Sequence, residues 1–150
     1  MNSVHFSSKT DLWETPQNIF EELNSKYGPF ELDVCSTESN AKCKNHFTIK
    51  DNGLNQEWCT FGNCWMNPPY GREIALWMKK AFTESLKGAT VVCLVPSRTD
   101  TLWWHEYAMR GDITFIRGRL KFSNAKHSAP FPSAIVVFRS KKQKVDFLFV

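Results

Sequence analysis

Four consecutive residues, Asn67-Pro68-Pro69-Tyr70, combine groups that can activate an amine for chemistry. The Asn67 side-chain carbonyl and the Pro68 backbone carbonyl are two acceptors for the two protons of an exocyclic amine. Because a proline that precedes another proline is restricted to extended conformations, the Pro68 carbonyl is held in one direction. Two such acceptors favour the tetrahedral nitrogen that attack on a methyl donor requires. The Tyr70 ring offers a face on which a planar base can stack, a contact worth about 1–3 kcal/mol.

The position of this tetrapeptide in the chain favours a site over a simple turn. It directly follows residues 64–66, Cys-Trp-Met, which we expect to form a buried strand. Two adjacent prolines fit neither a helix interior nor a central strand, so the strand must end there. Ligands bind at the carboxyl ends of the strands in open α/β sheets. The alternative is a proline-stiffened turn in which Tyr70 is ordinary packing.

The first half of the chain predicts a helix followed by a strand. Thr15-Pro16 is typical of a helix start, with an N-cap hydroxyl followed by proline at the first helical position. Gly28 predicts the end of this helix, and residues 30–35 predict a short strand. The apolar face of the helix comprises Ile19, Phe20, Leu23 and Tyr27.

Residues 36–63 are polar and poorly periodic. We expect one helix around Asn40 and one short strand at residues 46–49. The 31 residues from 36 to 66 are too few for the strands and helices that usually intervene, so the sheet is expected to be trimmed here.

The second half of the chain alternates helix and strand before a strand-rich end. Residues 72–86 predict a helix, residues 90–95 a buried β-branched strand, and residues 101–110 a helix capped by Asp100 and ended by Gly111. Further strands are predicted at residues 113–116, 120–122, 134–138 and 147–150. Together these elements predict an α/β fold with an open sheet that is mostly parallel and has antiparallel C-terminal strands.

Length and composition predict one domain over residues 1–150, without a separate target-recognition domain. The chain has 150 residues, of which 42% are hydrophobic, enough for one compact core. Its apolar runs are far shorter than the roughly 20 residues of a membrane span, and residues 1–10 show no secretory signal, so we expect a cytoplasmic protein. Five irregularly spaced cysteines indicate reduced thiols. The net charge of +4 suits a nucleic-acid partner without being specific for one.

Several spaced motifs, in one order, resemble the phage-type DNA N6-adenine methyltransferases, amino-methyltransferases with an Asn-Pro-Pro-Tyr signature. They are residues 11–16 (DLWETP), 30–36 (FELDVCS), 40–43 (NAKC), 67–71 (NPPYG), 95–100 (VPSRTD), 118–122 (GRLKF) and 129–133 (APFPS). The resemblance implies a reduced, Rossmann-like S-adenosylmethionine-dependent methyltransferase fold in a protein of bacteriophage or prophage origin. It also implies methyl transfer from S-adenosyl-L-methionine to adenine N6 in double-stranded DNA, at a short site. Asn67, Pro68, Pro69 and Tyr70 would form the catalytic loop.

The resemblance also implies where the cofactor binds. Asp33 and the adjoining turn through Cys35 and Ser36 would face its methionine end, and the residues that would close over it are Trp13, Thr15 and Pro16. An acid at a strand end can pair with the cofactor's amino group, and a helix N-terminus near Pro16 can hold its carboxylate. No glycine-rich turn follows Asp33. Asp51 is a candidate for the cofactor's ribose or adenine, with an ordinary Asn-Gly turn as the alternative.

Chemistry on adenine N6 in a stacked duplex would require base flipping. Phe122 could stack on the second face of the extruded adenine, or it could be a core residue at the end of a strand. Arg98, Arg119, Lys121 and Lys126 are candidate phosphate contacts, and each is also compatible with an ordinary surface charge. Residues 98–105 and 123–132 are long enough to reach a groove and would have to read the site.

Two other functions are compatible with parts of the sequence. Cys43, His46, Cys59 and Cys64 can be drawn as a zinc site in a non-catalytic nucleic-acid-binding module, although the second pair is spaced more loosely than in a zinc knuckle. A methyltransferase with this loop could also act on RNA adenine, cytosine N4 or protein glutamine, each a planar amine or amide. In the favoured interpretation the site holds no metal.

Overall fold

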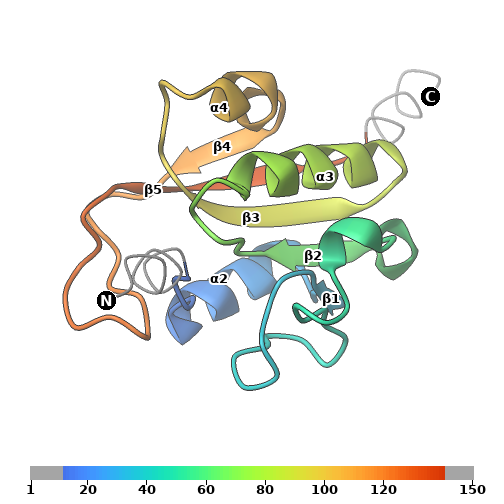
Figure 1. Cartoon of the computed structure of the whole chain (residues 1–150), viewed down its shortest axis with the longest axis horizontal. Helices are drawn as coiled ribbons and strands as arrows, with labels where there is room; N and C mark the ends of the chain where they lie inside the picture. The colour runs from blue at the N-terminus through green and yellow to red at the C-terminus, as the bar shows by residue number, and fades with distance from the viewer. Residues whose placement is uncertain (1–11, 141–150) are drawn as a thin grey trace, which may run out of the picture.

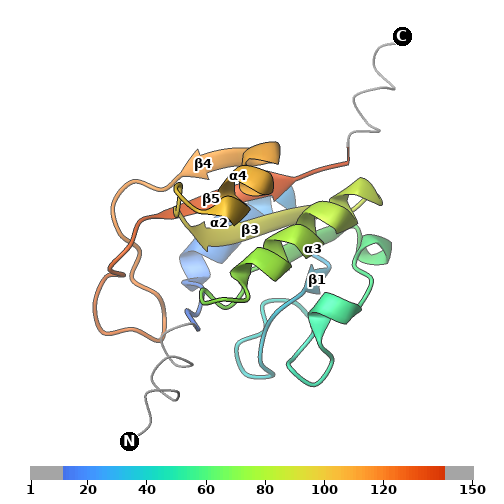
Figure 2. The same ribbon diagram turned by 45° about the horizontal axis from the view of Figure 1, so that its top comes forward.

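The computed structural model describes residues 12–140, and within that range five strands form one open sheet with helices on both faces (Figures 1 and 2). The strand order is β1-β2-β3-β5-β4. The strands are β1 (Leu32–Asp33), β2 (Asn63–Met66), β3 (Thr90–Pro96), β4 (Asp112–Phe115) and β5 (Ser133–Phe138). The helices are α2 (Gln17–Tyr27), α3 (Ile74–Leu86) and α4 (Leu102–Glu106), with 3-10 turns η1 (Gly53–Asn55), η2 (Cys59–Phe61) and η3 (Ala108–Arg110).

The sheet directions confirm the predicted fold class. β1, β2 and β3 are parallel, with Asp33 opposite Trp65 and Met66 opposite Cys93. β5 is antiparallel to both β3 and β4, so β4 runs in the same direction as β3. Four of the five strands in the described range therefore end at one edge of the sheet. The architecture is consistent with a Rossmann-like methyltransferase fold whose C-terminal strands pair antiparallel.

Helix α2 covers the β1 and β2 side of one sheet face, as its apolar spacing predicts. Phe20 packs edge-on against Trp65 of β2, with ring centroids 5.4 Å apart, and Gly28 ends the helix by donating its N–H to the Asn24 carbonyl. The predicted cap is wrong in one respect. The N-cap residue is Pro16, and no side chain within the described range caps this helix. The Thr15 hydroxyl is used elsewhere.

Helices α3 and α4 lie on the opposite face, with α3 in front of β3 in Figure 2. Trp77, Met78 and Ala81 form the buried stripe of α3 that the helical spacing predicts. The predicted helix at residues 101–110 is split into α4 and η3. Its cap is Thr101, whose side chain accepts the Trp104 N–H at 3.3 Å, so the prediction of Asp100 as the cap is wrong.

The stretch between β1 and β2 is held by turns instead of by the predicted helix and strand. Around Asn40, the Thr37 N–H donates to Asn40 Oδ1 at 2.7 Å and the Asn40 N–H donates to Thr37 Oγ1 at 3.2 Å, which closes a turn. The predicted strand at residues 46–49 is reduced to a single bridge between His46 and Asp33. Side chains that bond the backbone locally compete with helix and sheet formation.

A buried carboxylate, Glu84 on α3, ties this irregular stretch to that helix. Its Oε1 accepts the N–H groups of Trp58 and Cys59 at 2.7 and 3.0 Å, and its Oε2 accepts from Lys80 and Lys87, each at 3.2 Å. Burial alone would raise the pKa of Glu84, but the four donors outweigh burial and lower it below its usual value. The irregular stretch is therefore anchored although it contains little regular structure.

The C-terminal part contains β4 and β5, joined by a long loop. The predicted strand at residues 120–122 is wrong, because these residues belong to the loop. Ser123 and Asn124 in the loop bond to residues 12–15 instead of to a strand. The strand predicted at residues 147–150 lies outside the described residues.

No helix between residues 12 and 140 has the length and apolar character needed to cross a membrane. The five cysteines all lie in this range and carry free thiols, as predicted.

Candidate active site at the carboxyl edge of the sheet

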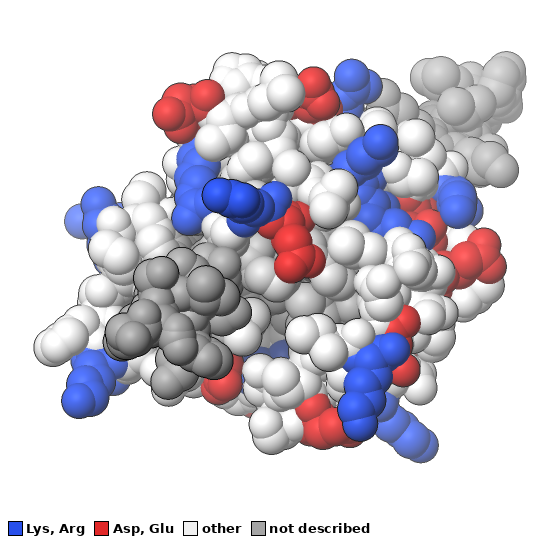
Figure 3. Space-filling view, in the orientation of Figure 1, with Lys and Arg blue, Asp and Glu red and all other residues white. Residues whose placement is uncertain are grey.

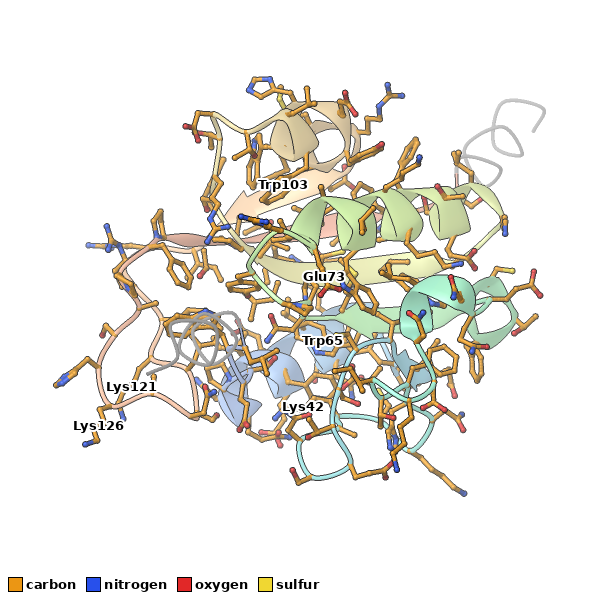
Figure 4. The ribbon with its side chains drawn as sticks, viewed as in Figure 1. Lys42, Trp65, Glu73, Trp103, Lys121 and Lys126 are labelled. Atoms are coloured by element: carbon orange, nitrogen blue, oxygen red, sulfur yellow. The ribbon has the colours of Figure 1, made fainter. Side chains whose placement is uncertain are left out.

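A cavity of about 940 Å³ opens where β1 and β2 end. Its walls come from six parts of the chain: residues 12–15, the stretch from Asp33 to Gly53, Trp65 of β2, the loop at residues 67–69, the start of α3, and residues 123–124 of the loop before β5. Figure 4 shows labelled residues from three of these parts, Lys42 after β1, Trp65 in β2 and Glu73 at the start of α3, around the same region. The sheet therefore places the Asn-Pro-Pro-Tyr loop beside a cavity that is open to a ligand.

Asn67 follows β2 directly, and its side-chain amide is held by hydrogen bonds to residues 12–15. Its Nδ2 donates to the Trp13 carbonyl at 2.5 Å and to Thr15 Oγ1 at 2.9 Å. Its Oδ1 is buried and has no hydrogen-bond partner in the described part of the chain. Asn67, Pro68 and Pro69 line the cavity. The acceptor oxygen that the sequence predicts for an amine is thus present and unused.

Tyr70, the last residue of the motif, is turned away from the cavity into the core. Its side chain is 1% exposed, and its hydroxyl donates to the Leu94 carbonyl of β3 at 3.0 Å. Burial raises the pKa of Tyr70 well above its ordinary value, so the hydroxyl stays protonated as this hydrogen bond requires. Arg98, after β3, donates from Nη1 to the Tyr70 carbonyl at 2.6 Å. The half-buried Arg98 therefore supports the loop in this structure.

Tyr70 belongs to an aromatic cluster that we define as Trp13, Tyr70, Phe122 and Phe131. Ring centroids lie 5.4 Å apart for Trp13 and Phe122, 5.7 Å for Tyr70 and Phe131, and 6.1 Å for Tyr70 and Phe122. Phe122 is 1% exposed, so of its two predicted roles the structure displays core packing. Stacking on a base stays a prediction, and it would require these rings to separate.

Asp33, at the end of β1, holds the turn that follows it. Its Oδ1 accepts the Cys35 N–H at 3.3 Å and its Oδ2 accepts the Lys42 N–H at 2.9 Å. Burial raises the pKa of Asp33 from 3.8 to about 6, against the opposing effect of these donors. Burial, with Asp33 and Glu73 nearby, raises the pKa of the Cys35 thiol to about 12, so this thiol is neutral.

The predicted cofactor-binding residues divide into two sets. Those that line the cavity are Trp13, Thr15, Asp33, Cys35 and Ser36. Pro16 and Asp51 do not line the cavity. The Asp51 carboxylate instead accepts from the Thr48 N–H at 2.8 Å and the Thr48 hydroxyl at 3.2 Å, closing a turn.

The residues next to Asp51, Asn52 and Gly53, reach the cavity wall in its place. Asn52 has a left-handed backbone with φ of 54°. A Cβ on Gly53 would lie 2.3 Å from the Val34 carbonyl oxygen and 3.1 Å from the Trp77 ring. The Asn-Gly pair is visible in the sequence as a turn signal. In the structure it lets the backbone at Gly53 lie close to the residue that follows β1, on the side of the cavity where no glycine-rich turn follows Asp33.

Sequence reasoning also missed several side chains of the cavity wall, most of which come from the irregular stretch and from the start of α3, with one from β2. They are Lys42, Phe47, Ile49, Trp65, Glu73 and Trp77. Ile49 is 94% exposed, and the buried Trp77 Nε1 has no acceptor among the described residues. A cavity with aromatic walls, exposed aliphatic surface and charged groups at its margin fits a ligand that has both a flat ring system and a charged end.

The loop between β4 and β5 carries positive charge without neighbouring acids in sequence. Residues 113–140 contain no Asp or Glu. Arg119, Lys121 and Lys126 are exposed, and in Figure 4 Lys121 and Lys126 extend away from the body of the protein. Figure 3 shows Lys and Arg side chains protruding at the same margin. This loop begins at the edge of the sheet that also holds the cavity.

The structure does not assemble the zinc site that the cysteine spacing allowed. Within residues 12–140, no cluster of three or more His, Cys, Asp or Glu side chains could hold a metal ion. His46 Nε2 pairs with the Glu38 carboxylate at 3.2 Å, and the Cys64 thiol faces the Trp58 carbonyl. The structural basis for the zinc module is therefore missing.

The sheet and the position of its loop are consistent with a Rossmann-like methyltransferase fold. Comparison with known proteins agrees: the family model described as DNA N-6-adenine-methyltransferase (Dam) matches residues 2–148. The chain belongs to this family.

Two phage proteins are among its relatives. A protein named DNA N-6-adenine-methyltransferase from Escherichia phage T1 is 31% identical over 96 residues, which cover 64% of this chain and 40% of that protein. A protein of the same name from Haemophilus phage HP1 is 35% identical over 98 residues, covering 65% of this chain and 56% of that protein. The chain thus spans about half the length of the relatives that it matches.

Proposed function

We propose that this chain transfers a methyl group from S-adenosyl-L-methionine to the N6 amine of adenine in double-stranded DNA. The proposal includes a short recognition site, read by the loops after β3 and β4, and extrusion of the target base from the helix. Family membership and the names of the two phage relatives support the reaction and the substrate class.

The observation that carries the proposal is the state of the Asn67 amide. Both of its protons are bonded to residues 12–15, and its buried oxygen has no donor in the described structure. A buried acceptor that lacks a partner costs about 1–3 kcal/mol. An amine that donates to this oxygen would regain that free energy, so the loop favours a ligand with an N–H group at this point.

The cavity beside the loop is the proposed cofactor site. S-adenosyl-L-methionine, when bound, supplies an electrophilic methyl group on a positively charged sulfur. Trp65 and Trp77 provide apolar wall for a ring system, and the Trp77 Nε1 is an unused donor in the described structure. Asp33 and the turn that it holds provide the polar end, where a carboxylate can attract an amino group. Residues 12–15 line the cavity, and one of them, Trp13, also belongs to the aromatic cluster.

The loop would act on the nucleophile by orienting two acceptors. The Asn67 side-chain carbonyl and the Pro68 backbone carbonyl would accept hydrogen bonds from the two N–H groups of the amine and stabilise the positive charge that develops on nitrogen. Tyr70 would stack on the base, which requires the aromatic cluster to open because the ring is 1% exposed. The exposed Arg119 and Lys121 would contact phosphates on either side of the extruded base.

The experiment that tests this proposal is transfer of a labelled methyl group to unmethylated DNA, followed by nucleoside analysis. We expect N6-methyladenine from the wild type and at least a 100-fold slower reaction from Asn67→Ala, because one preorganised group at a developing charge is commonly worth that much. Binding of S-adenosylhomocysteine should weaken far less than transfer, since Asn67 is one of many residues that line the cavity.

The matched control is Asn18→Ala, which changes an exposed asparagine on α2 and should leave transfer unchanged. Near-normal transfer by Asn67→Ala would remove the proposed mechanism. N4-methylcytosine as the product, or methyl transfer to RNA or protein alone, would overturn the proposed substrate while retaining the enzyme class.

A further inference from the structure

The Thr15 hydroxyl has an unexpected partner, and this partner indicates its role. A threonine before a proline at a helix start is expected to cap the helix. In the structure Thr15 Oγ1 instead accepts a hydrogen bond from Asn67 Nδ2 at 2.9 Å, and α2 has no side-chain cap in the described range. The side chain is buried, at 4% exposure. Its position is therefore determined by Asn67, 52 residues further along the chain.

The two hydrogen bonds from Asn67 Nδ2 determine whether the oxygen or the nitrogen of its side-chain amide is left for a ligand. The Trp13 carbonyl, at 2.5 Å, can only accept a hydrogen bond, so the atom facing it must be the amide nitrogen. Thr15 Oγ1 accepts a hydrogen bond from the second N–H of the same nitrogen. The amide is consequently prevented from turning by 180°, an orientation that would present a donor where an amine needs an acceptor.

Residues 12–15 are themselves held in place by the loop before β5. The Ser123 N–H donates to the Glu14 carbonyl at 2.9 Å, and the Ser123 hydroxyl donates to the Thr15 carbonyl at 3.2 Å. Asn124 receives the Glu14 N–H at 3.0 Å and donates from Nδ2 to the Leu12 carbonyl at 3.0 Å. Thr15 is thus fixed on both sides, which a residue that orients another must be.

We propose that Thr15 is a positioning residue, whose hydroxyl, together with the Trp13 carbonyl, fixes the Asn67 amide with its oxygen toward the amine to be methylated. The proposal rests on the proposed function for the reaction itself, but the orientation of the amide can be measured without any reaction. Thr15 does not need to touch substrate or cofactor to have this effect.

The test compares Thr15→Val, which keeps the shape and removes the acceptor, with Thr15→Ser, which keeps the hydroxyl. We expect Thr15→Val to lower kcat about 10- to 100-fold, because small errors in placement of a reacting group have effects of this size. Thr15 also lines the cavity, so S-adenosylhomocysteine affinity is measured alongside and should change much less than kcat. Thr15→Ser should retain most of the wild-type kcat. The control is Thr83→Val, which removes an exposed hydroxyl on α3.

A second readout is hydrogen exchange of the Asn67 side-chain amide by NMR, with the signals assigned by their loss in Asn67→Ala. Both protons should exchange slowly in the wild type and in Thr15→Ser, and one should exchange much faster in Thr15→Val. Equal exchange in all three proteins, or equal kcat for the Val and Ser variants, would overturn the positioning role. If Thr15→Val does not fold, Thr15→Ala is compared with Thr15→Ser in the same two measurements.

The two readouts separate this inference from the proposed function. A wild type that methylates no DNA but shows the predicted exchange pattern would overturn the proposed reaction and support the positioning of Asn67. A wild type that methylates DNA with an unchanged exchange pattern in Thr15→Val would do the reverse.

Discussion

The two sides of the Asn-Pro-Pro-Tyr loop differ in how ready they are for a ligand. On one side, Asn67, Pro68 and Pro69 face a cavity of about 940 Å³. On the other side, Tyr70 is packed into the aromatic cluster with Trp13, Phe122 and Phe131 and is 1% exposed. We call these the open side and the closed side. The difference indicates that the proposed cofactor site is preformed, whereas the proposed contact of a base with Tyr70 requires the closed side to rearrange.

Phe122→Ala should have the largest effect on the free energy of unfolding, because it removes a ring from the aromatic cluster of the closed side. Removing a buried phenylalanine typically lowers the free energy of unfolding by about 3–5 kcal/mol. Urea unfolding measures this loss, and S-adenosylhomocysteine affinity should be unchanged in the fraction that remains folded, since Phe122 does not line the described cavity.

Two milder variants sharpen the result on the closed side. Phe122→Leu keeps apolar packing without a ring, so a fold close to wild type with strongly reduced turnover would indicate base stacking, and normal turnover would leave only a core role. Tyr70→Phe keeps the ring and removes the hydrogen bond to Leu94, a loss of about 1 kcal/mol.

On the open side, the titration of Asp33 should make the free energy of unfolding depend on pH. Its folded pKa of about 6 lies above the ordinary value of 3.8, so the folded state retains a proton that the unfolded chain releases between these values. Its contribution to the free energy of unfolding is therefore complete below about pH 4 and decreases as the pH rises to about 6, by up to about 3 kcal/mol. Above pH 7 it is constant.

The measurement for Asp33 is urea unfolding of the wild type and of Asp33→Asn, which does not titrate, at several pH values from 4 to 8. The wild type should lose stability relative to the variant as the pH rises to 6. A difference between the two proteins that does not change with pH would contradict the raised pKa.

Gly53→Ala should damage the open side while leaving the closed side intact. The new Cβ would lie 2.3 Å from the Val34 carbonyl oxygen, so the backbone must move and the cavity wall with it. We expect a loss of about 1–3 kcal/mol in unfolding free energy and at least tenfold weaker S-adenosylhomocysteine binding by calorimetry. Asn55→Ala, in the same short turn, is the matched control. Cofactor binding equal to that of this control would show that the wall does not depend on Gly53.

The smallest effect is expected from Lys121→Ala, on the loop that also contributes Phe122 and Phe131 to the closed side. One lost phosphate contact should weaken DNA binding several-fold and make the slope of log K against log salt shallower by about 0.9. Lys79→Ala on α3 removes an equally exposed charge and should change neither quantity. An unchanged slope for Lys121→Ala would place the DNA elsewhere on the surface.

Local sequence signals predicted the parts of the fold that depend on local physics. Gly28 ends α2 and the β-branched run of β3 is buried, both as predicted. Predictions failed where a side chain forms hydrogen bonds with nearby backbone groups, as at Thr37 and Asn40. The closed turn there satisfies the same backbone groups that a helix would. They also failed at residues 120–122, where the Leu120 and Phe122 carbonyls accept from N–H groups of their own loop and the adjacent Ser123 bonds to residues 14 and 15.

The candidate site was predictable as far as the loop itself. The prolines after β2 predicted where Asn67 lies, and the edge of the sheet placed Asp33 nearby. The bond between Thr15 and Asn67 joins residues 52 positions apart, so no spacing in the sequence indicates it. For the same reason the contribution of Gly53 to the cavity wall could be found only from the fold, where it meets Val34.

The fixed amide of Asn67 also implies a filter among the four bases, before any flanking sequence is read. Because both of its protons are bonded to Trp13 and Thr15, the group can present only lone pairs to a base. Adenine N6 and cytosine N4 are exocyclic amines and match it, whereas guanine has its amine at N2, two ring positions from O6, and would have to enter in a different orientation to present it. Guanine O6 and thymine O4 are themselves acceptors and would meet lone-pair repulsion and an unsatisfied buried oxygen. Discrimination between adenine and cytosine must then come from the shape and depth of the space around the loop.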